Sequence, residues 1–142
     1  MKRIIVSVCA VAILAGLLAA PASAAVKHFQ GNVNGGGTVE FDVLFKQGKP
    51  KAAGFFDFDN IPVTCDGGET DAFYSTENAV RVTRKRKFTY RFNFGDDSLA
   101  RVSGRISKNG KRASGTTIRA NADLEGLTSC TTGGARRWNA ST

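Results

Sequence analysis

The sequence predicts an all-β protein, with antiparallel strands arranged as a sandwich or barrel of about eight strands. Apolar and polar residues alternate in several stretches, which is the pattern of half-buried strands. Turn-forming residues separate these stretches about every ten residues. No segment after residue 24 has a helical period. These observations together favour one antiparallel β-domain.

The N-terminus has the pattern of a cleaved signal peptide. Two basic residues precede an apolar stretch over residues 4–20, and Ala22-Ser23-Ala24 supplies the small residues that signal peptidase requires. We expect a signal-peptide helix over residues 1–24, cleavage between Ala24 and Ala25, and a single domain over residues 25–142 that is secreted or held in the cell envelope. An uncleaved anchor is the alternative, although the stretch is at the short limit for a bilayer span of about 17–25 residues.

Cys65 and Cys130 are the cysteines that remain after signal-peptide removal, and a Gly-Gly pair closely follows each of them. We expect both to lie in loops and to form a disulfide, because exported proteins fold in oxidising compartments. A bond that closes so long a segment stabilises a fold by roughly 4 kcal/mol in the loop-entropy description. Two free thiols are the alternative. On this interpretation the cysteines are structural.

The chain also suggests an internal duplication. The expected strands cover residues 26–33, 38–45, 51–59, 72–75, 79–83, 88–94, 99–106, 112–122 and 135–140. The order of strand, tip, strand, cysteine loop and strand occurs twice, which suggests two similar four-stranded halves joined by the disulfide. Chance similarity is the alternative, because Gly, Ser and Thr are abundant in the chain.

The two halves differ in the size of their apolar residues. Nine of the ten phenylalanines lie between Phe41 and Phe94. After Leu99 the residues expected to point inward are mostly small: Val102, Gly104, Ile106, Ala113, Gly115, Ile118 and Ala120. Large rings packed over small residues fill a core efficiently, so we interpret the aromatic residues as core rather than as a ligand platform.

Positive charge supplies the main functional candidate. The full chain carries a net charge of +8, and removal of Lys2 and Arg3 leaves 18 basic and 12 acidic residues, or +6. A dense part of this charge lies next to aromatic residues and forms the candidate polyanion site: Arg81, Arg84, Lys85, Arg86, Lys87 and Arg91. Such a cluster can bind a polymer through counterion release and stacking.

The register of this basic run predicts a turn. In an uninterrupted strand, Arg84 and Arg86 would share the buried face with Val82 and Phe88. Burying unpaired charge is costly, so we expect the chain to turn over residues 84–87. A solvated turn without any partner is the alternative to a binding site.

Acidic residues form a second candidate. Asp57 and Asp59 share a face of one expected strand, and further acids follow as far as Asp71. Carboxylate oxygens suit Ca²⁺, for which Asp57, Asp59 and Asp66 are candidate ligands, and a carboxylate pair can also hydrolyse glycosides. Solvated acids are the simpler interpretation. We expect no metal and no enzymatic activity, since His28 is the only histidine and no catalytic or zinc-binding motif is present.

The signal peptide, the β-rich body and the Cys…Gly-Gly…aromatic arrangement resemble small exported bacterial β-rich domains of unknown function. The resemblance implies no site residues. We expect a secreted, non-catalytic domain that binds an anionic polymer or glycan of the cell envelope. One alternative is a scaffold that acts through protein contacts, and another is a small hydrolase that uses the acidic residues. We further expect a monomer without a cofactor, a specific nucleic-acid partner or a membrane attachment after cleavage.

Intact-mass measurement of the exported protein tests both the cleavage and the disulfide. We expect a mass that lacks the first 24 residues and is lower by two hydrogens than that of the reduced chain. Reduction with dithiothreitol should restore the two hydrogens and serves as the control. A mass that retains both thiols would contradict the disulfide, and one that retains residues 1–24 would contradict the cleavage.

Overall fold

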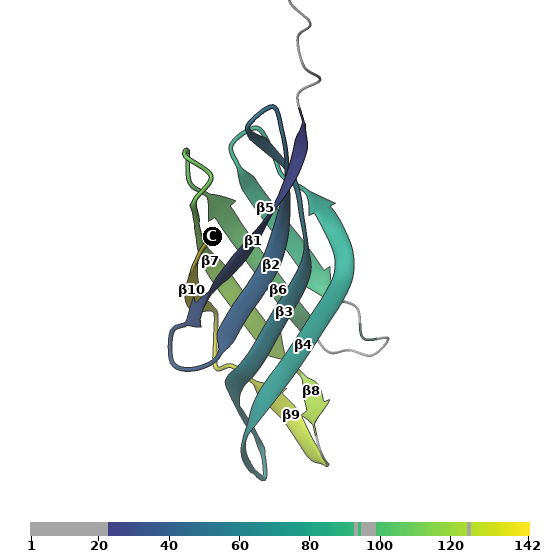
Figure 1. The fold of residues 1–142 in the computed structure, drawn as a ribbon. Helices are drawn as coiled ribbons and strands as arrows, with labels where there is room; N and C mark the ends of the chain where they lie inside the picture. Colours follow the sequence, from purple (N-terminus) through teal and green to yellow (C-terminus); the bar gives the residue numbers. More distant parts are fainter. Residues whose placement is uncertain (1–22, 93, 95–98, 125) are drawn as a thin grey trace, which may run out of the picture.

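The computed structural model describes residues 23–92, 94, 99–124 and 126–142. This part of the chain is a single antiparallel sheet that curls into a half-barrel (Figure 1), which confirms the all-β antiparallel prediction. The strands are β1 (Ala24–Val33), β2 (Thr38–Lys46), β3 (Lys49–Asp66), β4 (Gly68–Arg81), β5 (Lys87–Phe92), β6 (Leu99–Ile106), β7 (Arg112–Ala120), β8 (Ala122–Leu124), β9 (Leu127–Thr131) and β10 (Arg136–Ser141). Over the same residues, no helix has the length and hydrophobicity needed to cross a membrane.

The sheet consists of two four-stranded meanders that lie side by side. One contains β1, β2, β3 and β4 in that order, and the other contains β5, β6, β7 and β10. They join through the antiparallel pairing of β10 with β1, while β4 and β5 lie at the free edges of the two meanders. The short strands β8 and β9 are inserted between β7 and β10, and β9 pairs with β3. This inserted hairpin is the reason that the described chain has ten strands instead of about eight.

The expected signal peptide falls almost entirely on residues 1–22, which lie outside the described residues. Ala24 and Ala25 occupy the exposed beginning of β1, where they pair with Lys46 and Phe45 at the end of β2. Cleavage between the two alanines therefore stays a prediction.

The long hairpin of β3 and β4 corrects the prediction of a cysteine loop between separate strands. The expected strands 51–59, 72–75 and 79–83 merge into two continuous strands, interrupted only by register shifts near Phe55 and Asn60. Both residues have a positive φ of 53°. Bulges of this kind bend a strand without ending it, so Cys65 lies inside β3. Cys130 lies inside β9, and neither cysteine is in a loop.

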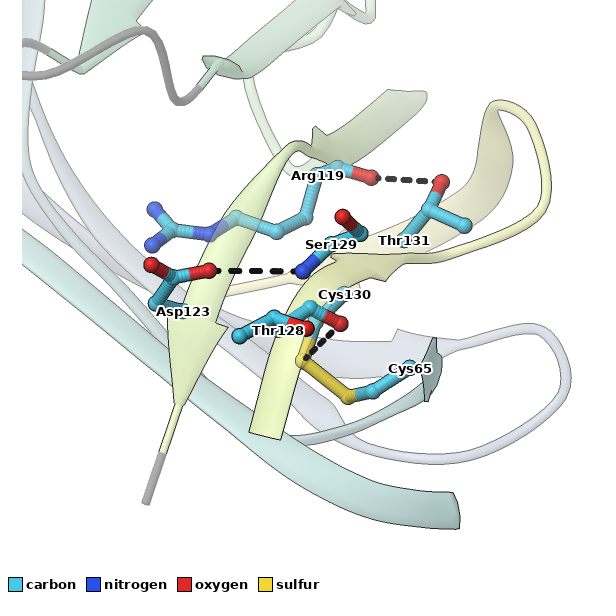
Figure 2. Close-up of a disulfide and its surroundings, with 7 residues drawn as sticks. All are labelled: Cys65, Arg119, Asp123, Thr128, Ser129, Cys130 and Thr131. Atoms are coloured by element: carbon cyan, nitrogen blue, oxygen red, sulfur yellow. Dashed lines mark hydrogen bonds between the residues drawn. A yellow bond between two sulfur atoms is a disulfide. The ribbon is translucent and has the colours of Figure 1, made fainter. Parts of the chain in front are cut away.

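The disulfide between Cys65 and Cys130 is confirmed, with the two Cα atoms 3.9 Å apart (Figure 2). It joins β3 to β9 next to the paired residues Thr64 and Thr131. On the other side of β9, the Thr131 hydroxyl donates to the carbonyl oxygen of Arg119 at 3.1 Å, so β9 connects the ends of β3 and β7. A disulfide at this point is consistent with an extracellular location.

Aromatic rings fill the concave side of the sheet. Phe41 of β2 lies at their centre, with its ring centroid 5.1 Å from that of Phe29, 5.5 Å from those of Phe56 and Trp138, and 5.7 Å from that of Phe88. Phe88 belongs to the second meander, so its contact with Phe41 crosses the interior of the half-barrel. The alternation predicted for residues 38–45 is confirmed, since Val39, Phe41, Val43 and Phe45 are all buried.

Trp138 is fully buried over a pair of glycines, as expected for large rings packed over small residues. Gly104 and Gly115 face each other across β6 and β7, and Gly115 also pairs with Trp138 of β10. A Cβ at Gly104 would lie 2.7 Å from the Trp138 ring and 2.6 Å from the Phe88 ring. The indole therefore occupies the space that two side chains would otherwise fill.

One part of the predicted core is wrong. Ile118 and Ala120 are only half-buried, and Thr117 and Arg119 are buried in their place. The pairing of β6 with β7 contains no register shift, so the alternation that places Ala113 inside continues unchanged to Arg119.

The substitution Gly104→Ala tests the packing of Trp138 against Gly104. We expect it to lower the free energy of unfolding by about 1–3 kcal/mol, because the added methyl group overlaps two rings that cannot both move away. Urea denaturation followed by tryptophan fluorescence measures the change. Ser114→Ala on the solvent side of β7 is the control and should change stability by less than about 0.5 kcal/mol. Equal stability of Gly104→Ala and the parent would contradict this packing.

Candidate anion-binding site

Three turns gather basic side chains at one end of the half-barrel, the upper end in Figure 1. They connect β2 with β3, β4 with β5, and β6 with β7. We call the following exposed residues in or beside these turns the basic end: Lys46, Lys49, Arg84, Lys85, Lys87, Lys108 and Lys111. Only Arg84, Lys85 and Lys87 belong to the run that the sequence singled out. The other four lie far away along the chain and are brought to it by the strand pairing.

The turn between β4 and β5 confirms the predicted bend. The backbone N–H of Thr83 donates to the carbonyl oxygen of Lys87, and that of Arg86 donates to Thr83, each at 2.8 Å. Arg86 has a positive φ of 60° and is half-buried, and its Nε donates to the Ile106 carbonyl oxygen at 3.1 Å. Arg86 therefore holds the turn against β6, while Arg84 and Lys85 point into solvent.

The turn between β6 and β7 is fixed by its own side chains. Asn109 Oδ1 accepts hydrogen bonds from the Ser107 hydroxyl at 2.7 Å and from the Lys111 backbone at 3.1 Å. Gly110 has a positive φ of 65° and lies against the Phe45 ring. Lys27 Nζ donates to the Gly110 carbonyl oxygen at 3.3 Å, so this turn is anchored to β1 and β2.

Arg81 borders the basic end, whereas Arg91 is separated from it. Arg81 is the last residue of β4 and is exposed beside the turn. Arg91 lies further along β5, where it faces Arg101 of β6 across the outer surface. The predicted six-residue cluster is therefore divided, with Arg91 on the convex face and Arg86 in a structural role.

The charges of the basic end have no carboxylate partners among the described residues. Both ion-pair contacts that join described residues involve His28. The described acids Asp66, Glu69, Asp71 and Asp123 lie on the two hairpins at the opposite end of the molecule. Unpaired basic side chains on one end produce a positive potential that favours an anionic partner.

Acidic residues gather on the convex side of β2 and β3. Glu40 faces Asp57 across these strands, and Thr38 faces Asp59. We call Glu40, Asp42, Asp57 and Asp59 the acidic face. Asp66 lies far along β3, and the described residues contain no group of three His, Cys, Asp or Glu side chains that could hold a metal ion. The candidate calcium ligands Asp57, Asp59 and Asp66 are therefore not brought together.

Sequence reasoning missed the role of His28 in the acidic face. Its Nδ1 lies 2.8 Å from Asp42 Oδ1, and its Nε2 lies 3.4 Å from Glu40 Oε2. The pairing of β1 with β2 places His28 opposite Asp42. The contact could therefore be predicted only if the register of these two strands were already known. Asp57 and Asp59 line none of the five surface hollows found among the described residues.

The buried polar groups belong to the interior packing. Arg119 is 6% exposed and lies over the Phe94 ring, 3.9 Å from its centroid. The Tyr74 hydroxyl and Thr117 Oγ1 are 2.7 Å apart. Burial raises the pKa of Tyr74 to about 12, although the hydrogen bond with Thr117 and the positive charge of Arg119 oppose the shift. Tyr74 therefore stays neutral under ordinary conditions and serves as a packed hydrogen-bonding group.

No protein-family model matches the chain, and searches among curated proteins and solved structures give no match. The likeness to exported bacterial β-rich domains therefore stays an expectation from the sequence.

Because Asp57 lies among other carboxylates of the acidic face, we expect Asp57→Asn to stabilise the protein at neutral pH. Desolvation, and then the charges of Glu40 and Asp59, raise the pKa of Asp57 above its ordinary value of 3.8. The folded state thus holds this proton more tightly than the unfolded state, so stability falls as the pH rises through the range above 3.8. At pH 7 the variant should gain a few tenths of a kcal/mol, roughly the value of an exposed charge interaction.

Thermal unfolding at neutral pH and at a pH below 3.8 measures this effect. The gain should disappear at the lower pH, where Asp57 is protonated in both states. Asp42→Asn is the control and should show no gain at neutral pH, because it replaces a carboxylate that is hydrogen-bonded with His28 by a weaker, neutral acceptor. A loss of stability for Asp57→Asn at pH 7 would contradict the explanation.

Proposed function

We propose that the protein is an exported, non-catalytic β-domain that binds an anionic polymer of the cell envelope through its basic end. The observation that carries the proposal is the convergence of three turns that present unpaired lysine and arginine side chains at one end. The disulfide and the apparent signal peptide support an extracellular setting. In that setting the available polyanions are envelope polymers and acidic glycans.

Two features support a rigid, electrostatic mode of binding. The β4–β5 turn is bonded to β6 and the β6–β7 turn is bonded to β1, so little backbone entropy of these two turns is lost when a partner binds. The acidic face lies on the convex side of β2 and β3 rather than at the turns, where it repels a polyanion and so orients it toward the basic end. The affinity is expected to fall steeply with salt, as for other contacts that release counterions.

A scaffold that acts through protein contacts is the second candidate, because one specific observation favours it. Val26 and Phe55 are 64% and 57% exposed on the convex side of the first meander. With Leu44, Ala52 and Ala79 they line an apolar hollow of about 270 Å³. Exposed apolar patches of this kind are typical of protein-interaction surfaces.

The double substitution Arg84→Glu/Lys85→Glu tests the basic end. We expect it to weaken binding to heparin by about tenfold or more at low salt, because it reverses two exposed contacts worth up to about 1 kcal/mol each. Arg86 is left intact because of its hydrogen bond to Ile106. Fluorescence titration at several salt concentrations measures both the affinity and its salt dependence.

The matched control is Arg91→Glu/Arg101→Glu, which changes the net charge equally but at a facing pair on the convex side of β5 and β6, away from the three turns. It should weaken binding less than the double substitution in the turn. Equal losses of affinity in the two variants would mean that net charge alone governs binding. An undiminished affinity of Arg84→Glu/Lys85→Glu would contradict a binding site at the basic end. A scaffold function that uses the apolar hollow would be unaffected by either pair of substitutions.

A further inference from the structure

The convex side of the second meander is a polar face without carboxylates among its described outward residues. Lys87, Arg105, Ser114 and Asn139 form one row across β5, β6, β7 and β10. The next row is Thr89, Ser103, Thr116 and Arg137. Every outward residue of these two rows is therefore basic, a hydroxyl or an amide. This composition differs sharply from the acidic face on the first meander.

Three shallow hollows with shared lining residues adjoin one another on this side, and we call them together the groove. The first, of about 310 Å³, lies over the two rows between Thr89 and Ser114. The second, also about 310 Å³, shares Arg105 and Ser114 with the first and extends to Asn139. The third, of about 460 Å³, shares Arg112 with the second and reaches the turn between β6 and β7. The groove thus runs from β5 across the sheet to the basic end.

We infer that this groove binds a linear acidic polysaccharide, and the inference rests on the proposed anionic-polymer function. Arg105 and Arg112 lie where the hollows meet, and a guanidinium group can bind carboxylate or sulfate through two parallel hydrogen bonds. Ser114 and Asn139 supply the donors and acceptors that sugar hydroxyls require.

The dimensions of the groove suit an extended chain. Neighbouring strands are about 4.8 Å apart, so a row across four strands is on the order of 15 Å long. A single small anion would contact only one of the three hollows. A polymer that lies along the groove contacts all three and then meets Lys108 of the basic end.

The lining of the groove disfavours single-stranded nucleic acid. Proteins that bind such strands stack bases on exposed aromatic rings. The one aromatic residue that borders the hollows is Phe88, which is 3% exposed and packs into the core. Hydroxyl, amide and guanidinium groups are the chemistry that remains, and it matches an acidic glycan.

Ser114→Tyr provides a test that does not alter charge. Ser114 is exposed and lines two of the three hollows, so a tyrosine there fills the groove at a position where strands accept aromatic residues. We expect about a tenfold or greater loss of affinity for polygalacturonate. Asn139→Tyr blocks the second hollow from β10 and serves as the second variant if Ser114→Tyr fails to fold. Ser75→Tyr, on the exposed surface of β4, is the matched control and should bind like the parent.

Titrations with polygalacturonate and with a thymidine oligonucleotide at the same low salt decide between the outcomes. Tighter binding of polygalacturonate, lost in Ser114→Tyr and kept in Ser75→Tyr, supports the groove. Undiminished polygalacturonate affinity in folded Ser114→Tyr and Asn139→Tyr, with loss in Arg84→Glu/Lys85→Glu, overturns the groove and leaves the basic end as the site. Equal or tighter binding of the oligonucleotide overturns the glycan assignment. Binding of neither polymer, nor of heparin, overturns the proposed function itself.

Discussion

The structure depends on aromatic side chains that fill the inside of a sheet over which the described residues form no second layer. Phe41 contacts rings from both meanders, and Phe88 reaches it across the interior. The sheet can curl tightly enough for this contact because Gly104 and Gly115 leave room for Trp138. Buried area on the concave side supplies the stability, since apolar surface removed from water contributes about 25 cal/mol per Å². The convex side therefore does not have to carry apolar residues.

That freedom explains the separation of charge on the outer surface. The convex side of β2 and β3 carries the acidic face, while the two rows across β5, β6, β7 and β10 contain only basic, hydroxyl and amide side chains. Apolar Val26 and Phe55 interrupt the first of these surfaces. A molecule with two oppositely charged outer surfaces can select and orient a charged partner without any deep pocket. Binding along a shallow groove and at the turn ends fits this architecture better than enclosure of a ligand.

Local pattern was enough to predict β2, the turn over residues 84–87 and the pairing of the cysteines. Each follows from a short-range rule: alternation in β2, the cost of burying Arg84 and Arg86, and oxidation of paired thiols. The extent of β3 was missed because bulges at Phe55 and Asn60 let a strand continue through a stretch that reads as a loop. The interior place of Arg119 was missed because a charged residue is not expected inside. The basic run was predicted from the sequence. The sequence did not predict that Arg86 would bond to β6 or that Arg91 would lie on the convex face, away from the turn.

The amino-acid sequence alone was enough to establish the β-class, the net positive charge, the disulfide-forming cysteines and the difference in residue size between the aromatic first part of the chain and the second part. These are properties of composition and of neighbours within a few positions. Tertiary structure alone decided which turns meet at the basic end, since Lys46, Arg84 and Lys108 belong to different hairpins. It also decided that β8 and β9 insert beside β3 and that Ser114 and Asn139 line one groove. Strand order is set by contacts between residues far apart in the chain, and no local pattern records it.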